Sequence, residues 1–189
     1  MTLSTPNGTR GARQPKASRL MRWVNGAAMK RIRTKGGSFM GMNALVLTTI
    51  GAKTGIERST PVGFFPGGDG RWLIVASAAG AAKNPGWYYN LGAHSDRVTV
   101  QLAGRSVPVT IEELQSEERA AAWKQIVAAS PRFGSYETKT DRVLPIIRLT
   151  PRADAAALSL SGPRTTDGDS SGLLRRVHAT RIRLGCYQA

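Results

Sequence analysis

The sequence predicts a mainly β fold of the α+β kind, a barrel of about six antiparallel strands with helices at its periphery. Runs of strand length, rich in β-branched and aromatic residues, are separated by turns that contain glycine. These runs do not alternate regularly with helical segments, which disfavours a doubly wound parallel sheet. The chain of 189 residues is long enough for one domain with a sizeable core.

Strands are predicted in the middle of the chain, at residues 44–50, 58–65, 71–77, 97–102, 105–112 and 143–149. Gly51 stops the first strand, and the turn sequence Pro-Gly-Gly-Asp-Gly at 66–70 separates the second strand from the third. Ala103 and Gly104 predict the turn of a hairpin between the fourth and fifth strands. Pro108 predicts an edge or a bulge in the fifth strand, because proline has no amide to donate.

Helices are predicted before, between and after these strands. The first follows residue 18 and ends near Gly36. The second begins at Asn84 and the third at Ser116, and both side chains are expected to cap the free amides of the first turn. The positions of the third helix that are expected to face the core are Ala120, Trp123 and Val127.

One domain with two tails is predicted. Residues 1–18 mix Thr, Pro, Gly and Arg without periodicity and are expected to form a disordered basic tail. Residues 19–151 are expected to form the barrel domain, which starts with an amphipathic helix. Residues 152–189 are rich in Gly, Ser and Asp clusters and are expected to form a flexible tail.

The net charge of +15 lies mainly outside the predicted barrel. Residues 1–40 contain nine Lys or Arg and no acid, whereas residues 41–151 contain twelve Lys or Arg and nine acids. A nucleic-acid-binding protein usually carries its positive charge on the folded module. No specific nucleic-acid partner is therefore expected, and binding through the basic tails is kept as a rival hypothesis.

The predicted helix at 19–35 has an apolar side with a basic margin. Two roles fit this pattern, contact with an anionic membrane surface and cover for the open end of the barrel. No apolar run is long enough for a signal-peptide core or a membrane span, and the single cysteine, Cys186, excludes an internal disulfide framework. A cytoplasmic protein is expected, with peripheral contact at the inner face of the cell membrane as the further alternative.

The chain lacks the motifs of several common catalytic classes. It contains no phosphate-binding loop, no dinucleotide-binding glycine motif, and no set of Cys and His residues for zinc. His94 is the one histidine within the predicted domain, and no nucleophile elbow accompanies it. Chemistry carried by a bound redox cofactor suits this inventory, because it needs few protein groups beyond those that hold and orient the cofactor.

The basic turn after the first predicted strand is the most informative segment. Gly51 and Gly55 bracket Lys53 and Thr54, so that the backbone can turn its amides outward. Lys53, the Thr54 hydroxyl and Arg58 could then donate to one anion, such as a phosphate or a carboxylate. The alternative is an ordinary solvated turn.

Three stretches together resemble the deazaflavin-dependent nitroreductase family, a branch of the split-barrel flavin and deazaflavin oxidoreductases. They are LTTIGAKTGIERSTP from Leu47, VASAAGAAKNPGWYYNL from Val75 and YETKTDRVLPIIRL from Tyr136. The similarity runs from about residue 43 to residue 151. It implies a split β-barrel that binds coenzyme F420, a deazaflavin hydride carrier with a phospholactyl-oligoglutamate tail.

The resemblance also implies roles for individual residues. Lys53 and Arg58 would contact the anionic tail of the coenzyme. Ser77 and the loop that leads to Lys83 would border the deazaflavin, and Trp87 would help to close the pocket. The full set of candidate cofactor-binding residues is Lys53, Thr54, Gly55, Arg58, Pro61, Ala76, Ser77, Lys83 and Trp87.

The sequence departs from the family pattern at several positions. Ala52 and Ala78 stand where many relatives carry a cation, so a weaker hold on the tail is expected. Ser130 and Phe133 stand at two positions where the nitroreductase pattern has tyrosines near the substrate. Tyr136 keeps its hydroxyl and is the candidate catalytic residue, a proton donor to the acceptor.

The leading hypothesis is a reductase that passes hydride from reduced F420 to a planar, electron-poor small molecule, a quinone or a nitroaromatic. The quinone is preferred because a basic amphipathic N-terminal helix could bring the enzyme to the membrane. The alternatives are a non-catalytic F420 carrier and a split barrel that uses FMN. A homo-oligomer is compatible with the sequence.

Overall fold

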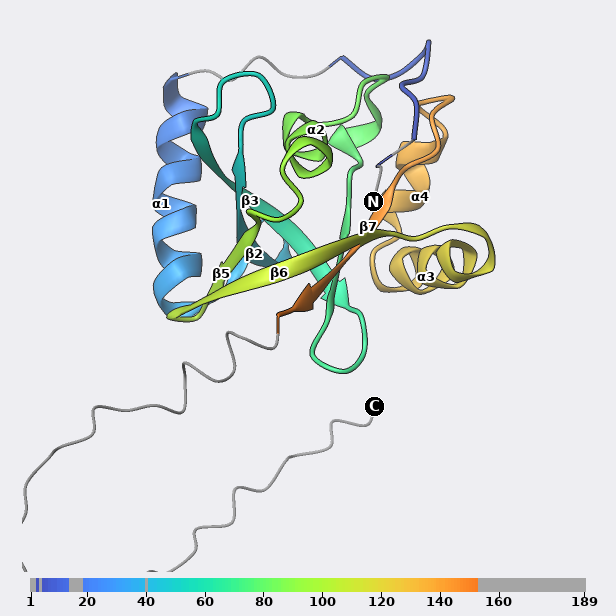
Figure 1. Cartoon of the computed structure of the whole chain (residues 1–189). Coiled ribbons are helices and arrows are strands. Elements are labelled where there is room, and N and C mark those ends of the chain that lie inside the picture. Colours follow the sequence, from blue (N-terminus) through green and yellow to red (C-terminus); the bar gives the residue numbers. More distant parts are fainter. Residues whose placement is uncertain (1–2, 4, 14–18, 40, 153–189) are drawn as a thin grey trace, which may run out of the picture.

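The structure is a computed structural model that describes residues 3, 5–13, 19–39 and 41–152 (Figure 1). Its helical elements are α1 (Arg19–Lys35), the 3-10 turn η1 (Ala78–Gly80), α2 (Gly86–Ala93), α3 (Ser116–Ala129) and α4 (Arg132–Glu137). Its strands are β1 (Ser38–Phe39), β2 (Met42–Ile50), β3 (Glu57–Pro66), β4 (Trp72–Val75), β5 (Thr99–Leu102), β6 (Arg105–Glu113) and β7 (Ile146–Pro151).

The described strands from β2 to β7 form a closed antiparallel barrel, which confirms the predicted fold class. Their order around the barrel is β2-β3-β4-β7-β6-β5, and β5 pairs again with β2. At this closing seam Leu47 lies opposite Val100. Closure satisfies the backbone of both seam strands, so neither is left as an open edge.

Two apolar clusters stabilise the domain. The first fills the barrel and includes Leu47, Ile74 and Ile147, all fully buried. The second lies between the barrel wall and helices α3 and α4, and includes Phe133 and Ile146. Because successive side chains of a strand point to opposite faces, β4 and β7 contribute to both clusters. Their continuous apolar sequences follow from this burial on both faces.

Several local predictions differ from the structure. The last strand begins at Ile146 and not at residue 143, and Val143 is 56% exposed. Pro108 does not lie on an edge strand. It lies opposite Thr99 of β5, at the place where β6 changes partner and pairs with β7 from Val109 onward.

The predictions for the helix starts were also wrong in detail. Neither Asn84 nor Ser116 caps a helix, because the cap positions are Pro85 and Gln115. In α3 the buried residues are Ala122 and Ile126, Trp123 and Val127 are half-buried, and Ala120 is exposed. Helix α4 was not predicted.

Helix α1 lies against β2, β3 and β5 (Figure 1). Ile32 is buried against β2, and the Arg33 guanidinium donates to Gln101 Oε1 (2.6 Å) and Ser59 Oγ (2.8 Å). Of the apolar residues of this helix, Leu20, Met21, Trp23 and Val24 lie outside the part of the chain whose side chains are described. None of the described helices is long and apolar enough to cross a membrane.

Residues 5–13, which were expected to belong to a disordered tail, form an N-terminal strap. The amides of Gly8 and Ala12 each donate to a carbonyl of the 76–84 segment at 2.8 Å. Asn7 Oδ1 accepts from the Asn84 amide and from a tyrosine hydroxyl of α2. The structure thus differs from the prediction over residues 5–13, whereas the predicted C-terminal tail lies beyond residue 152, outside the described residues.

The strap can be tested by substituting Gly11. A Cβ there would lie 2.1 Å from the Ala82 nitrogen and 2.6 Å from the Ala81 carbonyl carbon, which are backbone atoms. We expect Gly11→Ala to displace the strap and to accelerate tryptic cleavage after Arg10 about tenfold, because cleavage follows local opening. Gly26→Ala, where nothing lies within 4 Å, is the matched control. An unchanged cleavage rate in Gly11→Ala would contradict the bound strap.

Candidate functional site

The basic turn between β2 and β3 has a backbone that needs its glycines. The Gly51 amide donates to the Ile56 carbonyl (2.9 Å), and the Gly55 amide donates to the Gly51 carbonyl (2.8 Å). Gly55 has a φ of 64°, in the left-handed region that favours glycine. This geometry places Lys53 and Thr54 in the exposed part of the turn.

Gly51 also brings two predicted donors together. A Cβ on Gly51 would lie 2.5 Å from Thr54 Oγ1 and 3.2 Å from Arg58 Nε. The missing side chain therefore leaves the space that these two polar groups share. Within the described part of the chain, Lys53 and Arg58 form no ion pair, so both charges are available to an external anion.

Asn90 of α2 holds this turn and was missed by the sequence analysis. Its Oδ1 accepts from the Ala52 amide (3.0 Å), and its Nδ2 donates to Thr49 Oγ1 (3.1 Å). The sequence signal that could have identified Asn90 is its amide side chain, which stands in a short helix of mostly aromatic and apolar residues. Asn90 fixes the basic turn to α2.

The loop at 76–84 carries the predicted ring-side residues and has an unusual backbone. Ala78, Ala79 and Gly80 have φ values of 46°, 56° and 80°. A left-handed alanine costs about 1–2 kcal/mol, so the surroundings must hold this turn. Ser77 is half-buried at its start, whereas Ala76 is fully buried, with its amide bonded to the Pro145 carbonyl (2.9 Å).

Arg142 supports this loop from within the protein. Its donor–acceptor distances are Nη1 to Ala76 O 3.0 Å, Nη1 to Asn84 Oδ1 2.6 Å, Nη2 to Ser77 O 2.9 Å and Nε to Ala81 O 3.2 Å. Arg142 is only 4% exposed, and this burial lowers its pKa from the usual range. A guanidinium remains a cation even so. The residue lies in the third family-like stretch, but its role was not predicted.

Helix α4 brings Tyr136 to the same loop. A Cβ on Gly80 would lie 3.0 Å from the Tyr136 carbonyl oxygen, so the backbones are in close contact. The Tyr136 ring packs edge-on against Phe133 (5.5 Å), and the Lys139 ammonium lies 5.4 Å from its centre. No described residue forms a hydrogen bond with the Tyr136 hydroxyl. Ser130, by contrast, lies at the end of α3.

Helix α2 joins the basic turn to the ring-side loop. It starts two residues after Asn84, and Asn90 near its other end reaches Ala52. An eight-residue helix is about 12 Å long, so both loops lie at one end of the barrel (Figure 1). Trp87 is half-buried and packs against the barrel core, and Lys83 is exposed just before the helix.

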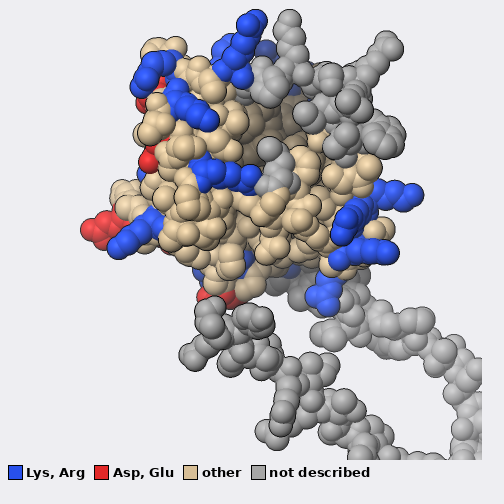
Figure 2. All heavy atoms as spheres, turned by 180° about the vertical axis from the view of Figure 1, so that it is seen from behind, with Lys and Arg blue, Asp and Glu red and all other residues tan. Residues whose placement is uncertain are grey.

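The structure thus groups most of the predicted cofactor-binding residues on these two loops and on α2. Pro61 is the exception, because it lies within β3 opposite Val46 and is half-buried. Figure 2 shows a hollow in the upper half of the molecule, toward the end of the barrel that carries the β2–β3 turn. Lys and Arg side chains border this hollow above and below, whereas the carboxylates in this view lie at the margins.

Asp141 anchors the strap beside this site. Its carboxylate accepts from the Thr9 hydroxyl and from the amides of Thr9 (3.1 Å) and Arg10 (3.0 Å). These hydrogen bonds, led by that of the Thr9 hydroxyl, lower the pKa of Asp141 to about 2. The carboxylate therefore favours the bound strap above its ordinary pKa of 3.8, and this contribution is lost as the pH falls through about 2.

We expect the Asp141 carboxyl resonance to titrate with a midpoint of about 2, and the Thr9 and Arg10 amide shifts to follow it. NMR of the labelled protein between pH 6 and pH 1.5 measures both. At neutral pH, Asp141→Asn should speed exchange of these two amides, whereas Asp69→Asn on the β3–β4 turn should not. A midpoint near 3.8 would show that the strap contacts are absent in solution.

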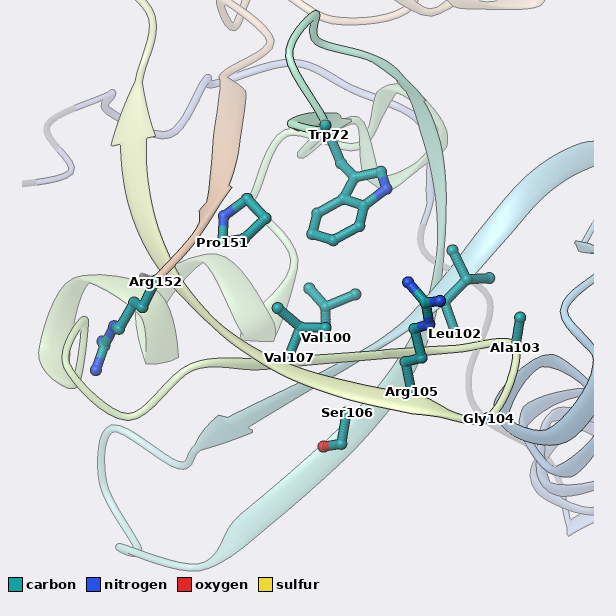
Figure 3. Close-up of a pocket in the computed structure, with 11 residues that line it drawn as sticks. Trp72, Val100, Leu102, Ala103, Gly104, Arg105, Ser106, Val107, Pro151 and Arg152 are labelled. Carbon is teal, nitrogen blue, oxygen red and sulfur yellow. The ribbon is translucent and has the colours of Figure 1, made fainter. Parts of the chain in front are cut away.

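A cavity of about 860 Å³ lies elsewhere in the described part of the chain. It is lined by Trp72, Val100, Leu102, Val107 and Pro151, with Gly104 and Arg105 of the β5–β6 hairpin (Figure 3). In Figure 3 the Arg152 side chain points away from the centre of this cavity. The β5–β6 hairpin lies at the end of β2 opposite the basic turn, and no predicted site residue lines the cavity.

No group of three His, Cys, Asp or Glu residues within the described ranges could hold a metal ion. The described site instead offers cationic and neutral hydrogen-bond donors. Such a donor set suits an anionic organic ligand.

Comparison with known proteins gives a consistent picture. Residues 20–151 match the model of the F420H(2)-dependent quinone reductase family. The chain is 37% identical over 113 residues to an F420H(2)-dependent quinone reductase of Mycobacterium tuberculosis, which covers 58% of this chain and 74% of that protein.

Two solved structures are similar in sequence and fold. One is an F420-H2 dependent reductase (FDR-A), with 38% identity, a TM-score of 0.50, and coverage of 56% of this chain and 92% of that one. The other is a domain-swapped dimer, with 34% identity, a TM-score of 0.52, and coverage of 69% of this chain and 98% of that one.

Proposed function

Because the chain belongs to the F420H(2)-dependent quinone reductase family, we propose that it reduces a quinone with hydride taken from reduced F420. The observation that carries this proposal is the convergence of a cationic turn and a strained, donor-bearing loop at one end of the barrel. Helix α2 follows the loop directly after Asn84 and Pro85, and its Asn90 bonds the turn. When bound, the coenzyme supplies the hydride.

The basic turn would hold the anionic tail of the coenzyme. Lys53 is exposed, and the Thr54 hydroxyl and Arg58 Nε converge beside Gly51. Charged donors of this kind bind phosphate and carboxylate oxygens more strongly than neutral donors do. Lys83 would add a further cation on the approach to the ring-side loop.

The ring-side loop and α2 would orient the deazaflavin. Ser77 offers a half-buried hydroxyl, and Trp87 offers an aromatic surface that packs against the barrel core. Tyr136 would hold a proton for the acceptor oxygen, since hydride transfer to a quinone must be balanced by a proton. Neither Ser130 nor Phe133 carries the phenolic hydroxyl that a tyrosine would place there, and this favours a quinone over a nitroaromatic as the acceptor.

Contact with an anionic membrane is proposed as the means by which a lipid-soluble quinone reaches the enzyme. The described cations of the exposed side of α1 are Lys30, Arg31 and Lys35. Cations near an anionic lipid surface contribute about 1 kcal/mol each. Co-sedimentation with anionic liposomes should fall on charge reversal of these three residues, and equal sedimentation with neutral liposomes would refute this part.

Fluorescence titration of the purified protein with F420, and in parallel with FMN, tests the cofactor proposal. Binding of F420 but not FMN is expected. The loss of F420H2 absorbance on addition of a quinone then tests catalysis, and tight binding without any reoxidation would establish a carrier. A homo-oligomer, as in the domain-swapped relative, can be tested on the same sample by light scattering.

A further inference from the structure

Arg142 contacts both ends of the ring-side loop. Its three side-chain nitrogens together reach acceptors that range from residue 76 to residue 84. Its own amide is fixed by Thr140 Oγ1 (3.2 Å), and the Thr140 hydroxyl in turn donates to the Arg10 carbonyl of the strap (2.9 Å). The loop is thus held on its buried side by the Arg142 side chain and on its other side by the backbone of the strap.

The burial of this guanidinium needs an explanation. Its acceptors among the described residues are neutral carbonyl and amide oxygens, and a buried charge without a carboxylate partner is unfavourable unless its hydrogen bonds are well satisfied. An apolar side chain could fill the same space. The reason for an arginine here is therefore its planar fork of hydrogen-bond donors, which bind the loop at several points.

The hydrogen bonds of the guanidinium offset the strain of this backbone. Directly after Ser77, two left-handed alanines turn the chain, and the amides of Ala78 and Ala79 have no acceptor among the described residues. Ala79 is exposed and Ala78 is half-buried. Two free amides next to the Ser77 hydroxyl form a compact set of neutral donors.

We propose that Arg142 is the positioning residue of the ring site: it holds the loop so that Ser77, Ala78 and Ala79 present these donors to the polar edge of the deazaflavin. This inference rests on the proposed function. The pyrimidinedione edge of a deazaflavin carries carbonyl and ring-nitrogen acceptors, which such a set can bind. Arg142 itself acts from behind the loop.

The test separates the ring from the tail of the coenzyme. Two ligands are titrated by fluorescence into the full chain: F420, and its riboside, which has the same ring but lacks the phosphate and glutamates. Arg142→Lys keeps the charge but loses the fork, because one ammonium cannot reach acceptors at both ends of the loop. We expect the dissociation constants for both ligands to rise about tenfold, with their ratio unchanged.

Two control variants and one exchange measurement define the outcome. Arg119→Lys alters an arginine that donates to the Leu144 carbonyl (3.1 Å) outside the loop, and it should leave both constants unchanged. Lys53→Ala should weaken F420 and leave the riboside alone. In the free protein, the Gly80 and Ala81 amides donate to the Ser77 (2.9 Å) and Ala78 (3.1 Å) carbonyls, and their hydrogen exchange should be faster in Arg142→Lys than in the wild type. A general loss of stability would not confine this change to the loop.

A second variant covers the case in which Arg142→Lys fails to fold. Asn84→Ala removes one acceptor of the fork and leaves the barrel intact, and it should weaken the riboside about threefold. The inference is overturned if the riboside binds Arg142→Lys or Asn84→Ala as it binds the wild type. It is also overturned if Arg119→Lys weakens the riboside equally. If the wild-type chain binds neither ligand, the proposed function fails as well.

Discussion

Replacing both Lys53 and Arg58 with alanine is expected to raise the dissociation constant for F420 about 100-fold. A hydrogen bond to a charged group contributes about 1.5–3 kcal/mol, and a tenfold change in affinity corresponds to about 1.4 kcal/mol. Because both side chains are exposed, the lower value applies to each, about 3 kcal/mol in total. The difference from the wild type should shrink as salt is added, since salt screens exposed charges.

A matched double variant isolates the effect of position from that of charge. Lys124→Ala with Arg105→Ala also removes one lysine and one arginine, both exposed, from α3 and from the β5–β6 hairpin. It should change the dissociation constant less than threefold, and the tail-less riboside should bind all three proteins alike. If F420 binds the Lys53 and Arg58 variant as tightly as the wild type, the β2–β3 turn is not the tail site.

The second large effect is expected at Tyr136. Tyr136→Phe should lower kcat with a quinone about 100-fold, at the lower end of the range for loss of a general acid. The phenylalanine ring keeps the contacts with Phe133 and Lys139, so F420 should bind with an unchanged dissociation constant. Steady-state kinetics and fluorescence titration measure the two quantities separately.

Tyr89→Phe is the control for Tyr136→Phe. Tyr89 also carries a hydroxyl near the site, but it donates to Asn7 Oδ1 (2.6 Å) of the strap and is 42% exposed. Its loss should leave kcat within twofold. Equal kcat values for Tyr136→Phe and the wild type would assign the proton to water.

The barrel was predictable because its signals are local. The β-branched run before Gly51, the paired glycines of the basic turn and the turn at Ala103 and Gly104 each report on a few neighbouring residues. The structure confirms the strands that these signals bound. The grouping of the two candidate loops followed from the family resemblance and could not be derived from strand periodicity.

The supports of the site were not predictable for the opposite reason. Arg142 lies 65 residues from Ser77, and Thr9 lies 132 residues from Asp141, so their contacts exist only in the folded chain. The same cause explains the wrong cap at Asn84. A hydrogen bond from a buried guanidinium is stronger than one from a helix amide. Asn84 Oδ1 therefore accepts from Arg142 and does not cap the helix.

The short helix between the two loops has a consequence for selectivity. Since Asn90 fixes one loop and Asn84 the other, the separation of the two subsites is set by a rigid spacer and not by a flexible linker. When the ring and the negative end of a molecule are separated by the same distance as the two subsites, binding at one subsite raises the effective concentration at the other. Such a molecule binds more tightly than either part would alone. A flat molecule without the matching negative end can occupy only one subsite. The length of the helix therefore selects ligands by the distance between their ring and their charge.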